Sequence, residues 1–459
     1  MFRRKETVRY NTMAILALGF LALIVLGGVL LWIPACNEQP LEFFDALFTS
    51  VSAVCVTGLM TITPAVQFTL LGKIILLILI QVGGLGIISC AAAVSFLVRR
   101  EIHLRGKMML QETYNMGQSR GILVMLRRVL IATGVMEGIG AVFYAIRFVP
   151  MFGAAKGIGY GVFHSISAFC NAGIDILGNS SLTAYHTDAV INVTTMLLII
   201  FGGLGFTVWF DLTGNTRKVF RREQPKGWLF TRLTLHTKLV LVMTVILILV
   251  GAGLVFLMEF ENPDTIGTMP LGQKVMASFF HSVSTRTAGF YTFDMGGMHE
   301  ETKFVSCILM FIGGSPGGTA GGIKTTTFAM LILTCITVIR GGKDTECFGR
   351  KITFANFRTG FAVFMVSLGA FVVGVLLLSM FEPDQILFIN ILYEAASAVG
   401  TVGLSADLTP QLTRISQIVL MVLMYMGRLG PITLALLFAG KNNARDKIRQ
   451  LPDEDIIVG

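Results

Sequence analysis

Four glycines at a nearly constant spacing mark the residues of this chain that could bind a dehydrated cation. Gly58, Gly173, Gly289 and Gly403 lie 115, 116 and 114 residues apart in a chain of 459 residues, so the repeat accounts for the whole polypeptide. Main-chain carbonyl oxygens can replace the hydration shell of an alkali cation, and glycine can adopt the positive φ that turns successive carbonyls toward one axis. The predicted ion-binding filter consists of Val56, Thr57 and Gly58, of Asn171, Ala172 and Gly173, of Thr287, Ala288 and Gly289, and of Thr401, Val402 and Gly403.

The four glycine segments are similar but not equal. They read VCVTG, FCNAG, TRTAG and VGTVG, each a few residues after a serine, and the third is one residue shorter between its serine and its glycine. A different interpretation is that these are packing glycines, as in close helix contacts of the GxxxG type. Four glycines at a common period, each after a short apolar stretch, favour the filter.

The composition indicates a multi-pass membrane protein. Hydrophobic residues make up 54% of the chain and charged residues 14%, which excludes a soluble globule. An apolar run of about 20 residues is long enough to span a bilayer as a helix. Eight spans are predicted, at 13–33, 70–98, 124–149, 186–211, 235–258, 304–339, 356–380 and 412–438.

Between the two spans of each pair lies a shorter apolar stretch. The four stretches, 43–54, 158–169, 274–285 and 387–398, can enter the bilayer but cannot cross it, so the chain must return as a loop. We predict an all-α fold of four tandem repeats, each with a helix, a pore helix, a filter loop and a second helix, around one central pore. The predicted repeats are 1–123, 124–234, 235–355 with an interrupted gate helix, and 356–459 with a cytoplasmic tail.

The basic residues predict which ends of the spans face the cytoplasm. The N-terminus, three connections between repeats and the C-terminal tail hold 27 of the 36 Lys and Arg residues, so both termini are predicted to be cytoplasmic. Several connections next to the pore loops are acidic instead, and we expect them to face outward, where a cation would arrive. The net charge of +9 is explained by the inner surface, and nucleic-acid binding is disfavoured.

The sixth predicted span carries a second candidate site. Residues 304–339 would form a helix far longer than a bilayer is thick, but their centre, GGSPGGTAGGIKTTT, does not favour a helix. Irregular backbone at membrane depth persists only where protein buries it or water reaches it, which fits a gate inside a pore and not a cytoplasmic linker. The predicted gate residues of this loop are Gly313, Gly314, Gly317, Gly318, Gly321, Gly322 and Lys324.

Arg428 is a charge inside the eighth predicted span. The first two repeats have Gly-Gly-Leu-Gly at this place, at 83–86 and 202–205, where the fourth has Gly-Arg-Leu-Gly. A charge at membrane depth needs an acceptor, and the carbonyls of the broken 313–322 backbone are the nearest plausible ones. We expect Arg428 to hold this loop across the pore, and Lys324 either to assist or to reach toward a helix end. The glycine motifs themselves are expected to be close-packed or bending points.

No arrangement typical of an enzyme is found. The GGTAGGIKT segment differs from a nucleotide-binding loop because Ile323 separates Gly322 from the lysine. No paired carboxylates, activated nucleophile or metal-ligand cluster occurs, so neither catalysis nor a cofactor is predicted.

Taken together, the four single-glycine loops, the paired spans and the interrupted sixth span resemble the Trk/Ktr/HKT superfamily of potassium transporters, over essentially the whole chain. The Ktr-type membrane subunit is the most similar, because the first filter glycine is already at position 58 and no additional helix pair precedes it. The resemblance implies potassium uptake across a bacterial plasma membrane, with sodium as a possible activator or coupling ion. It also implies a homodimer in the lipid membrane and a cytosolic nucleotide-binding regulatory ring of the RCK type.

Two alternatives stay open at this stage. A sodium-coupled potassium symporter would have the same filter, and the sequence does not separate it from a downhill pathway. A non-conducting membrane scaffold or a substrate carrier would use the glycines for packing alone.

Overall fold

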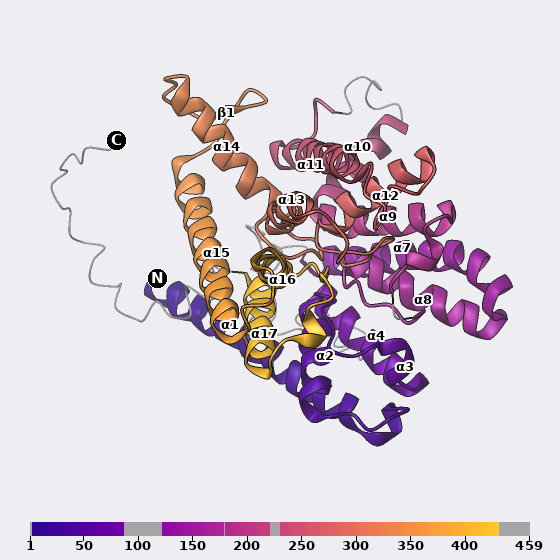
Figure 1. Cartoon of the computed structure of the whole chain (residues 1–459). Helices are drawn as coiled ribbons and strands as arrows, with labels where there is room; N and C mark the ends of the chain where they lie inside the picture. The colour runs from indigo at the N-terminus through magenta and orange to yellow at the C-terminus, as the bar shows by residue number, and fades with distance from the viewer. Residues whose placement is uncertain (1, 87–121, 179, 221–229, 431–459) are drawn as a thin grey trace.

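The computed structural model describes residues 2–86, 122–178, 180–220 and 230–430 (Figure 1). The predicted cytoplasmic tail, most of the connection between the first two repeats, and the ends of the predicted spans 70–98 and 412–438 lie outside the described residues. The predicted repeat boundaries stay predictions.

The described chain consists almost entirely of helices that recur in one order. The first repeat contains α1 (Phe2–Trp32), α2 (Phe43–Cys55), the short α3 (Pro64–Gln67) and α4 (Leu70–Leu85). The second contains α7 (Ile122–Phe152), α8 (Ala154–Cys170), α9 (Ala189–Leu204) and α10 (Phe206–Phe220). The third contains α11 (Leu235–Glu259), α12 (Leu271–Ser284), α13 (Glu300–Phe311) and α14 (Thr325–Ile339). The fourth contains α15 (Phe354–Phe381), α16 (Phe388–Gly400) and α17 (Arg414–Leu429), with single 3-10 turns at Pro34–Cys36, Thr183–Tyr185 and Thr409–Gln411 between helices.

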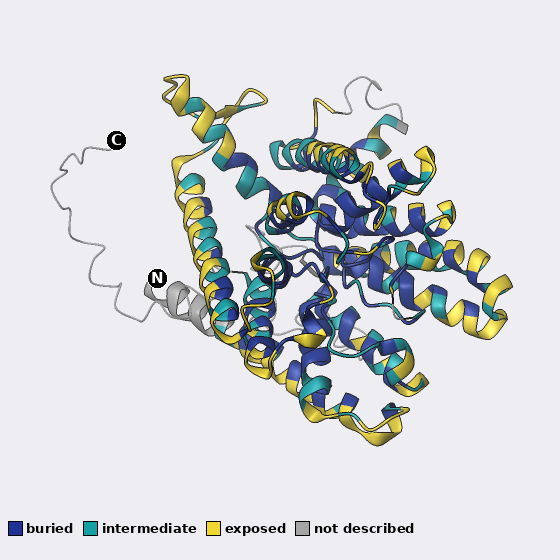
Figure 2. Cartoon of the chain, viewed as in Figure 1, coloured by how far each residue is buried: buried dark blue, intermediate teal, exposed yellow. Residues whose placement is uncertain are grey.

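The first helix of each repeat is long and apolar enough to cross a bilayer. The apolar segments are Ala14–Trp32, Val124–Phe152, Leu235–Glu259 and Phe354–Phe381. Their outward faces expose large apolar side chains, as expected of helices in contact with lipid. Figure 2 shows the exposed residues along α15 and on the outer helices, and the buried residues at the centre. The predicted spans 13–33, 124–149, 235–258 and 356–380 are confirmed as continuous helices.

In the second repeat the second helix is not a straight span, and here one prediction was wrong. The segment 186–211 was expected to cross as one helix, but α9 and α10 meet at an angle of 97°. The cause is Gly205, whose φ of +89° and ψ of 142° do not continue a helix and are open only to glycine among the common residues. Gly86 and Gly430 end α4 and α17 in almost the same conformation, with φ of +86° and +84°. The last glycine of each motif therefore ends a helix, and the bend predicted at these motifs is confirmed at Gly205.

The interruption predicted in the sixth span is also confirmed. Helix α13 ends at Phe311, α14 begins at Thr325, and the residues between them are irregular apart from a single parallel bridge from Ile312 to Ile323. A short hairpin of β1 (Glu346–Cys347) and β2 (Arg350–Lys351) then connects α14 to α15.

Three of the four pore helices are bound to the first helix of their repeat in the same way. In the first three repeats a pore-helix serine donates to a carbonyl of that helix, Ser50 to Ile24 at 2.7 Å, Ser165 to Glu137 at 2.6 Å and Ser282 to Ile248 at 2.8 Å. Gly27, Gly140 and Gly251 leave the space that these serine hydroxyls occupy. The fourth repeat has Ala395 at the matching position. This recurrence is direct structural support for the internal repeat.

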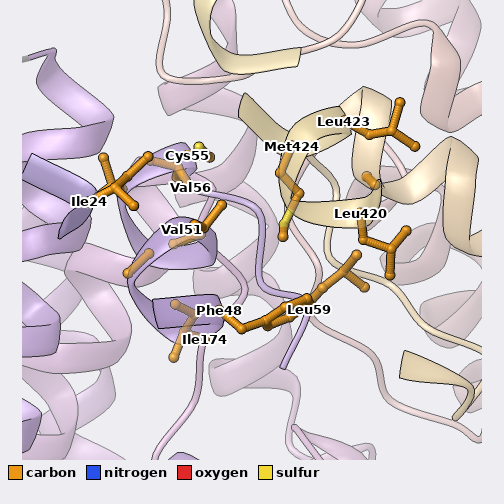
Figure 3. Close-up of a cluster of buried hydrophobic side chains, with 14 of the residues drawn as sticks. Ile24, Phe48, Val51, Cys55, Val56, Leu59, Ile174, Leu420, Leu423 and Met424 are labelled. Atoms are coloured by element: carbon orange, nitrogen blue, oxygen red, sulfur yellow. The ribbon is translucent and has the colours of Figure 1, made fainter. Parts of the chain in front are cut away.

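The repeats close into a ring. The second helix of each repeat packs against the pore helix of the next one: α4 on α8, α9 on α12, α13 on α16, and α17 on α2. Figure 3 shows the last of these contacts, where Leu420, Leu423 and Met424 of α17 belong to one cluster of buried side chains with Phe48 and Val51 of α2. On the outer side, Arg414 at the start of α17 binds Glu42 at 2.6 Å and Asp45 at 2.7 Å. The fourth repeat therefore lies beside the first, around a common axis.

Candidate ion filter and gate

The four filter loops share one backbone conformation although their sequences differ. The residue two places before each filter glycine has a positive φ: 56° at Val56, 60° at Asn171, 74° at Thr287 and 50° at Thr401. None of them is glycine, and a non-glycine residue in this region costs about 1–2 kcal/mol. Such a cost at four equivalent positions indicates a backbone shape that the fold imposes on different side chains.

The serine of each pore helix holds its loop in place. Gly58 donates its amide to Ser52 Oγ at 2.9 Å, and Gly403 donates to Ser397 Oγ at 3.0 Å. In the other two repeats the serine hydroxyl donates instead, from Ser167 to the Ile174 carbonyl at 2.7 Å and from Ser284 to the Phe290 carbonyl. The sequence contained the signal, a serine five or six residues before each glycine, but its role follows only from the structure.

The filter glycines meet one another in cyclic order. A β-carbon added to Gly58 would lie 2.6 Å from the Ala172 carbonyl, and one added to Gly289 would lie 2.6 Å from the Val402 carbonyl. Added to Gly173 or Gly403, it would come closer still, to the carbonyls of Ala288 and Thr57. Each glycine thus borders the carbonyl that precedes the next glycine around the ring. The structure brings together all four predicted loops, whose candidate ligands are Val56, Thr57, Gly58, Asn171, Ala172, Gly173, Thr287, Ala288, Gly289, Thr401, Val402 and Gly403.

Two side-chain oxygens lie at the end of the loops that faces the glycine-rich segment 312–324. Asn171 Oδ1, beside Gly202, and Thr401 Oγ1, beside Gly321, are buried and have no hydrogen-bond partner among the described residues. Asn171 Nδ2 donates to Thr287 Oγ1 of the next repeat at 3.2 Å. Unpartnered buried oxygens are costly, so this position suits water or a cation.

On the other side of the ring lies a cavity of about 270 Å³. The four filter glycines form its floor, and Asp175 and Asp407 contribute carboxylates to its wall, while no lysine or arginine occurs among its described lining residues. Burial raises the pKa of Asp175 to about 6, although the main-chain amides of Leu177 and Gly178 lower it. An acidic cavity over the filter can concentrate cations.

The sequence had indicated acid on the outer side but not these residues. In the acidic connections predicted to face outward, Glu42 and Asp45 are bound to Arg414, and Glu259 accepts bonds from Asn262, Thr265 and the His299 amide. Asp175 and Asp407 follow their filter glycines by two and four residues, a short distance that could have identified them.

The glycine-rich loop lies directly between the filter and the helix break of the second repeat. Thr319 donates its hydroxyl to the Phe169 carbonyl at 3.0 Å and its amide to the Gly202 carbonyl at 3.1 Å. The amide of Phe206, at the start of α10, donates to the Gly317 carbonyl at 3.1 Å. Gly321 has no room for a side chain because Thr401 of the filter occupies that space.

The other loop glycines make room for backbone contacts. Gly313 lies against Gly321 and Gly322, Gly314 against Ala320 and Gly203, and Gly318 against Gly202 and Gly205. Gly317 and Gly322 have positive φ values of 74° and 66°, and space around Gly317 is open.

Arg428 joins three repeats at one point. Its guanidinium donates to the carbonyls of Thr319 in the loop, of Gly83, and of Gly84 at 2.9 Å. The predicted loop acceptor is confirmed, whereas the two carbonyls of α4 were not foreseen. They are free because α4 ends at Leu85, which leaves the last carbonyls of the helix without helical partners. Lys324 stays local, donating to Ala320 at 2.8 Å and Gly321 at 3.3 Å within the same loop.

Buried histidines serve the scaffold. His281 bonds Ser306 at 2.9 Å, and His164 bonds the Tyr160 carbonyl at 2.7 Å. No group of three metal-ligating side chains occurs among the described residues.

A chain that places four re-entrant helices and four glycine loops around one axis within apolar spanning helices is a pore-type membrane transport protein. Its sequence matches the model of the TrkH cation transport protein family over residues 4–447, and the chain belongs to that family. This confirms the resemblance inferred from the sequence.

Several curated proteins are similar over their whole length. The chain is 37% identical to Ktr system potassium uptake protein B of Bacillus subtilis (strain 168), covering 98% of each chain. It is 35% identical to the potassium/sodium uptake protein NtpJ of Enterococcus hirae over 100% of both chains, and 34% identical to Ktr system potassium uptake protein B of Vibrio alginolyticus over 99% and 97%. The crystal structure of the potassium transporter TrkH from Vibrio parahaemolyticus shares the fold, with a TM-score of 0.73 at 19% identity, over 94% of this chain and 85% of that one.

Proposed function

We propose that this chain takes up potassium across a bacterial plasma membrane, through a single pore lined by its four filter loops. The observation that carries the proposal is the cyclic contact of Gly58, Gly173, Gly289 and Gly403 with the carbonyls of neighbouring loops. Such a ring offers a dehydrated cation a set of main-chain oxygens, and the acidic cavity over it favours cations over anions. Potassium is the transported substrate, and the chain needs no cofactor and catalyses no reaction.

Closure of the pore is assigned to the loop of residues 312–324. In the described conformation this loop lies against Thr401 of the filter and is bound by Arg428. Because Arg428 also binds α4, release of its guanidinium would remove the hydrogen bonds that connect the loop, α4 and α17. The gate is therefore opened by any cytoplasmic signal that moves α4 or α17.

The partners of this subunit are inferred from its relatives. Proteins named as parts of a Ktr system are 34–37% identical, which supports a separate cytosolic regulatory subunit, and we propose the nucleotide-binding RCK type. A homodimer in the lipid membrane is the proposed assembly. The name of the Enterococcus relative includes sodium, which keeps sodium as an activator or as a coupling ion in a symport mechanism.

The function is tested with the purified chain in lipid vesicles. Uptake of potassium down its own gradient, saturable and stronger than that of sodium, is expected without any sodium gradient. Uptake that occurs only with an inward sodium gradient would show the symporter instead. No cation uptake in either condition, with the protein inserted, would leave a non-conducting scaffold or a carrier of another substrate and would refute the proposal.

The gate is tested separately by replacing Arg428 with alanine. Loss of its three bonds should raise potassium flux, because the loop is no longer fixed below the filter. Arg147→Ala is a matched control, because the exposed side chain of Arg147 binds Asp188 at 2.5 Å and, among the described residues, makes no hydrogen bond to the loop. Equal flux in the Arg428→Ala variant and the unmodified chain would refute the gate.

A further inference from the structure

One position in the pore helices has a different role in the fourth repeat. Nine places before the filter glycine, the first repeat has Thr49, the second His164 and the fourth Glu394. The third repeat has His281 eight places before its glycine. Thr49 bonds a carbonyl of its own helix at 2.8 Å, and the two histidines bond the scaffold. Glu394 alone is a carboxylate, and its bonds go to the segment beyond the filter.

Glu394 has no exposed surface, and both of its oxygens are used. Oε1 accepts the hydroxyl of Ser405 and the amide of Ala406 at 3.2 Å, and Oε2 accepts the hydroxyl of Thr409 at 2.7 Å. All three donors lie within residues 405–409, directly after Gly403. Three hydrogen bonds from one short segment converge on this carboxyl group, so a single buried side chain fixes the segment from behind.

The segment that Glu394 fixes carries a carboxylate of the outer cavity. Ser405 and Asp407 both line that cavity, and Asp407 is held at a positive φ of 60°. Its carboxylate lies near a second one: a β-carbon on Gly296 would be 3.3 Å from Asp407 Oδ2 and 3.4 Å from Asp294 Oδ1. Lys303 is the cation that faces both carboxylates. Repulsion between neighbouring carboxylates would drive Asp407 away from this place unless its backbone were fixed.

We propose that Glu394 is a positioning residue for potassium uptake, which keeps Asp407 at the wall of the cavity by anchoring residues 405–409. The proposal rests on the uptake function proposed above. Asp407 then attracts potassium to the filter from outside, so Glu394 acts on the potassium concentration at half-maximal uptake and not on the maximal rate.

The test compares KM and maximal rate of potassium uptake in vesicles for the full-length chain and its variants. Glu394→Ala should raise KM about tenfold, at the low end of what electrostatic focusing achieves, with the maximal rate changed by less than about twofold. Glu394→Gln should largely rescue KM, because its amide oxygen still accepts and its amide group can donate to Thr409. Thr49→Ala, at the matching position of the first repeat, should leave KM unchanged.

A double-variant comparison separates this role from general support of the fold. Asp407→Asn alone should raise KM to a similar extent, and adding Glu394→Ala to it should raise KM no further, because both act through one carboxylate. The KM difference should shrink at high ionic strength. If Glu394→Ala does not insert, Thr409→Val removes one of the three bonds and should raise KM in the same direction by a smaller factor.

The outcomes are distinguishable from failure of the proposed function. If the unmodified chain shows no saturable potassium uptake, the function itself is refuted. If the unmodified chain transports but the Glu394 and Thr409 variants keep its KM, or if the effects of Glu394→Ala and Asp407→Asn multiply, the positioning role is refuted.

Discussion

The ring of glycines predicts a ranked response to alanine substitution in the filter. A β-carbon at Gly173 would lie 2.7 Å from the Gly289 Cα, and one at Gly403 would lie 2.8 Å from the Gly58 Cα. The nearest Cα to a β-carbon at Gly289 or Gly58 would be 3.2 or 3.3 Å away. We expect Gly173→Ala and Gly403→Ala to be the more damaging pair.

The magnitude follows from the movement needed to relieve each contact. To restore an ordinary carbon–oxygen separation of about 3.3 Å, the Ala172 carbonyl must move roughly 0.7 Å away from a β-carbon at Gly58, and the Ala288 carbonyl, which lies closer to Gly173, must move further. The larger shift moves the adjacent carbonyl, the proposed ion ligand, away from the axis. If this displacement of the carbonyl reduces the free-energy preference for potassium over sodium by about 1.4 kcal/mol, the selectivity ratio falls about tenfold. The Gly58 and Gly289 variants should lose less of this selectivity.

The assay is uptake of potassium and of sodium by vesicles that contain each alanine variant. Gly153→Ala is the control, because Gly153 also has a positive φ, 81°, but has nothing within 4 Å of the added carbon. It carries the same backbone penalty, about 1–2 kcal/mol, without crowding a neighbour. Equal loss of selectivity at Gly153, or greater loss at Gly58 than at Gly173, would refute the reasoning.

Three further predictions concern the cavity, the ring closure and the loop anchor. Asp175 has a pKa raised to about 6, so its carboxylate is ionised above that pH and neutral below it. The KM for potassium uptake should therefore rise as external pH falls from 7 to 5, and Asp175→Asn should flatten this dependence of KM on pH. Arg414→Ala should lower the free energy of unfolding of the detergent-solubilised protein by about 1 kcal/mol or less, because its ion pairs with Glu42 and Asp45 lie near the surface. Thermal unfolding measures this loss, and an equal loss in 1 M salt would contradict an ionic origin. Ser397→Ala removes the acceptor of the Gly403 amide, a bond of about 1 kcal/mol, and should reduce potassium preference in uptake assays while leaving the amount of inserted protein unchanged.

The sequence predicted the repeated architecture well because hydropathy and length decide it. The stretch predicted as 43–54 is the helix Phe43–Cys55, and the stretch predicted as 387–398 is Phe388–Gly400. The interruption of the sixth span was predictable from helix propensity, because a segment with so many glycines does not favour a helix. An acceptor for Arg428 was predictable because a charge inside a membrane must be satisfied somewhere.

Other features depend on contacts between distant segments, and local patterns do not carry them. The segment 186–211 looks like an ordinary span, and only the conformation of Gly205 turns it by 97°. Positive φ at Val56 and Thr401 runs against the preference of branched residues and results from tertiary constraint. Glu394 reads as one carboxylate in an apolar stretch, and its role depends on hydroxyls 11 and 15 residues later in the chain.

The structure separates what the repeats share from what distinguishes them. The filter depends on backbone shape, and the four loops reach the same shape with different side chains, so conduction requires no sequence symmetry. At the second position of the helix-end motif, two repeats have Gly84 and Gly203 where the fourth has Arg428. A side chain at Gly84 would collide with Cys170, and the carbonyl of the same residue is an acceptor for Arg428. The fourth repeat therefore binds the first through a main-chain carbonyl at the matching position, and this asymmetry places the contact of the proposed gate on one side of the ring.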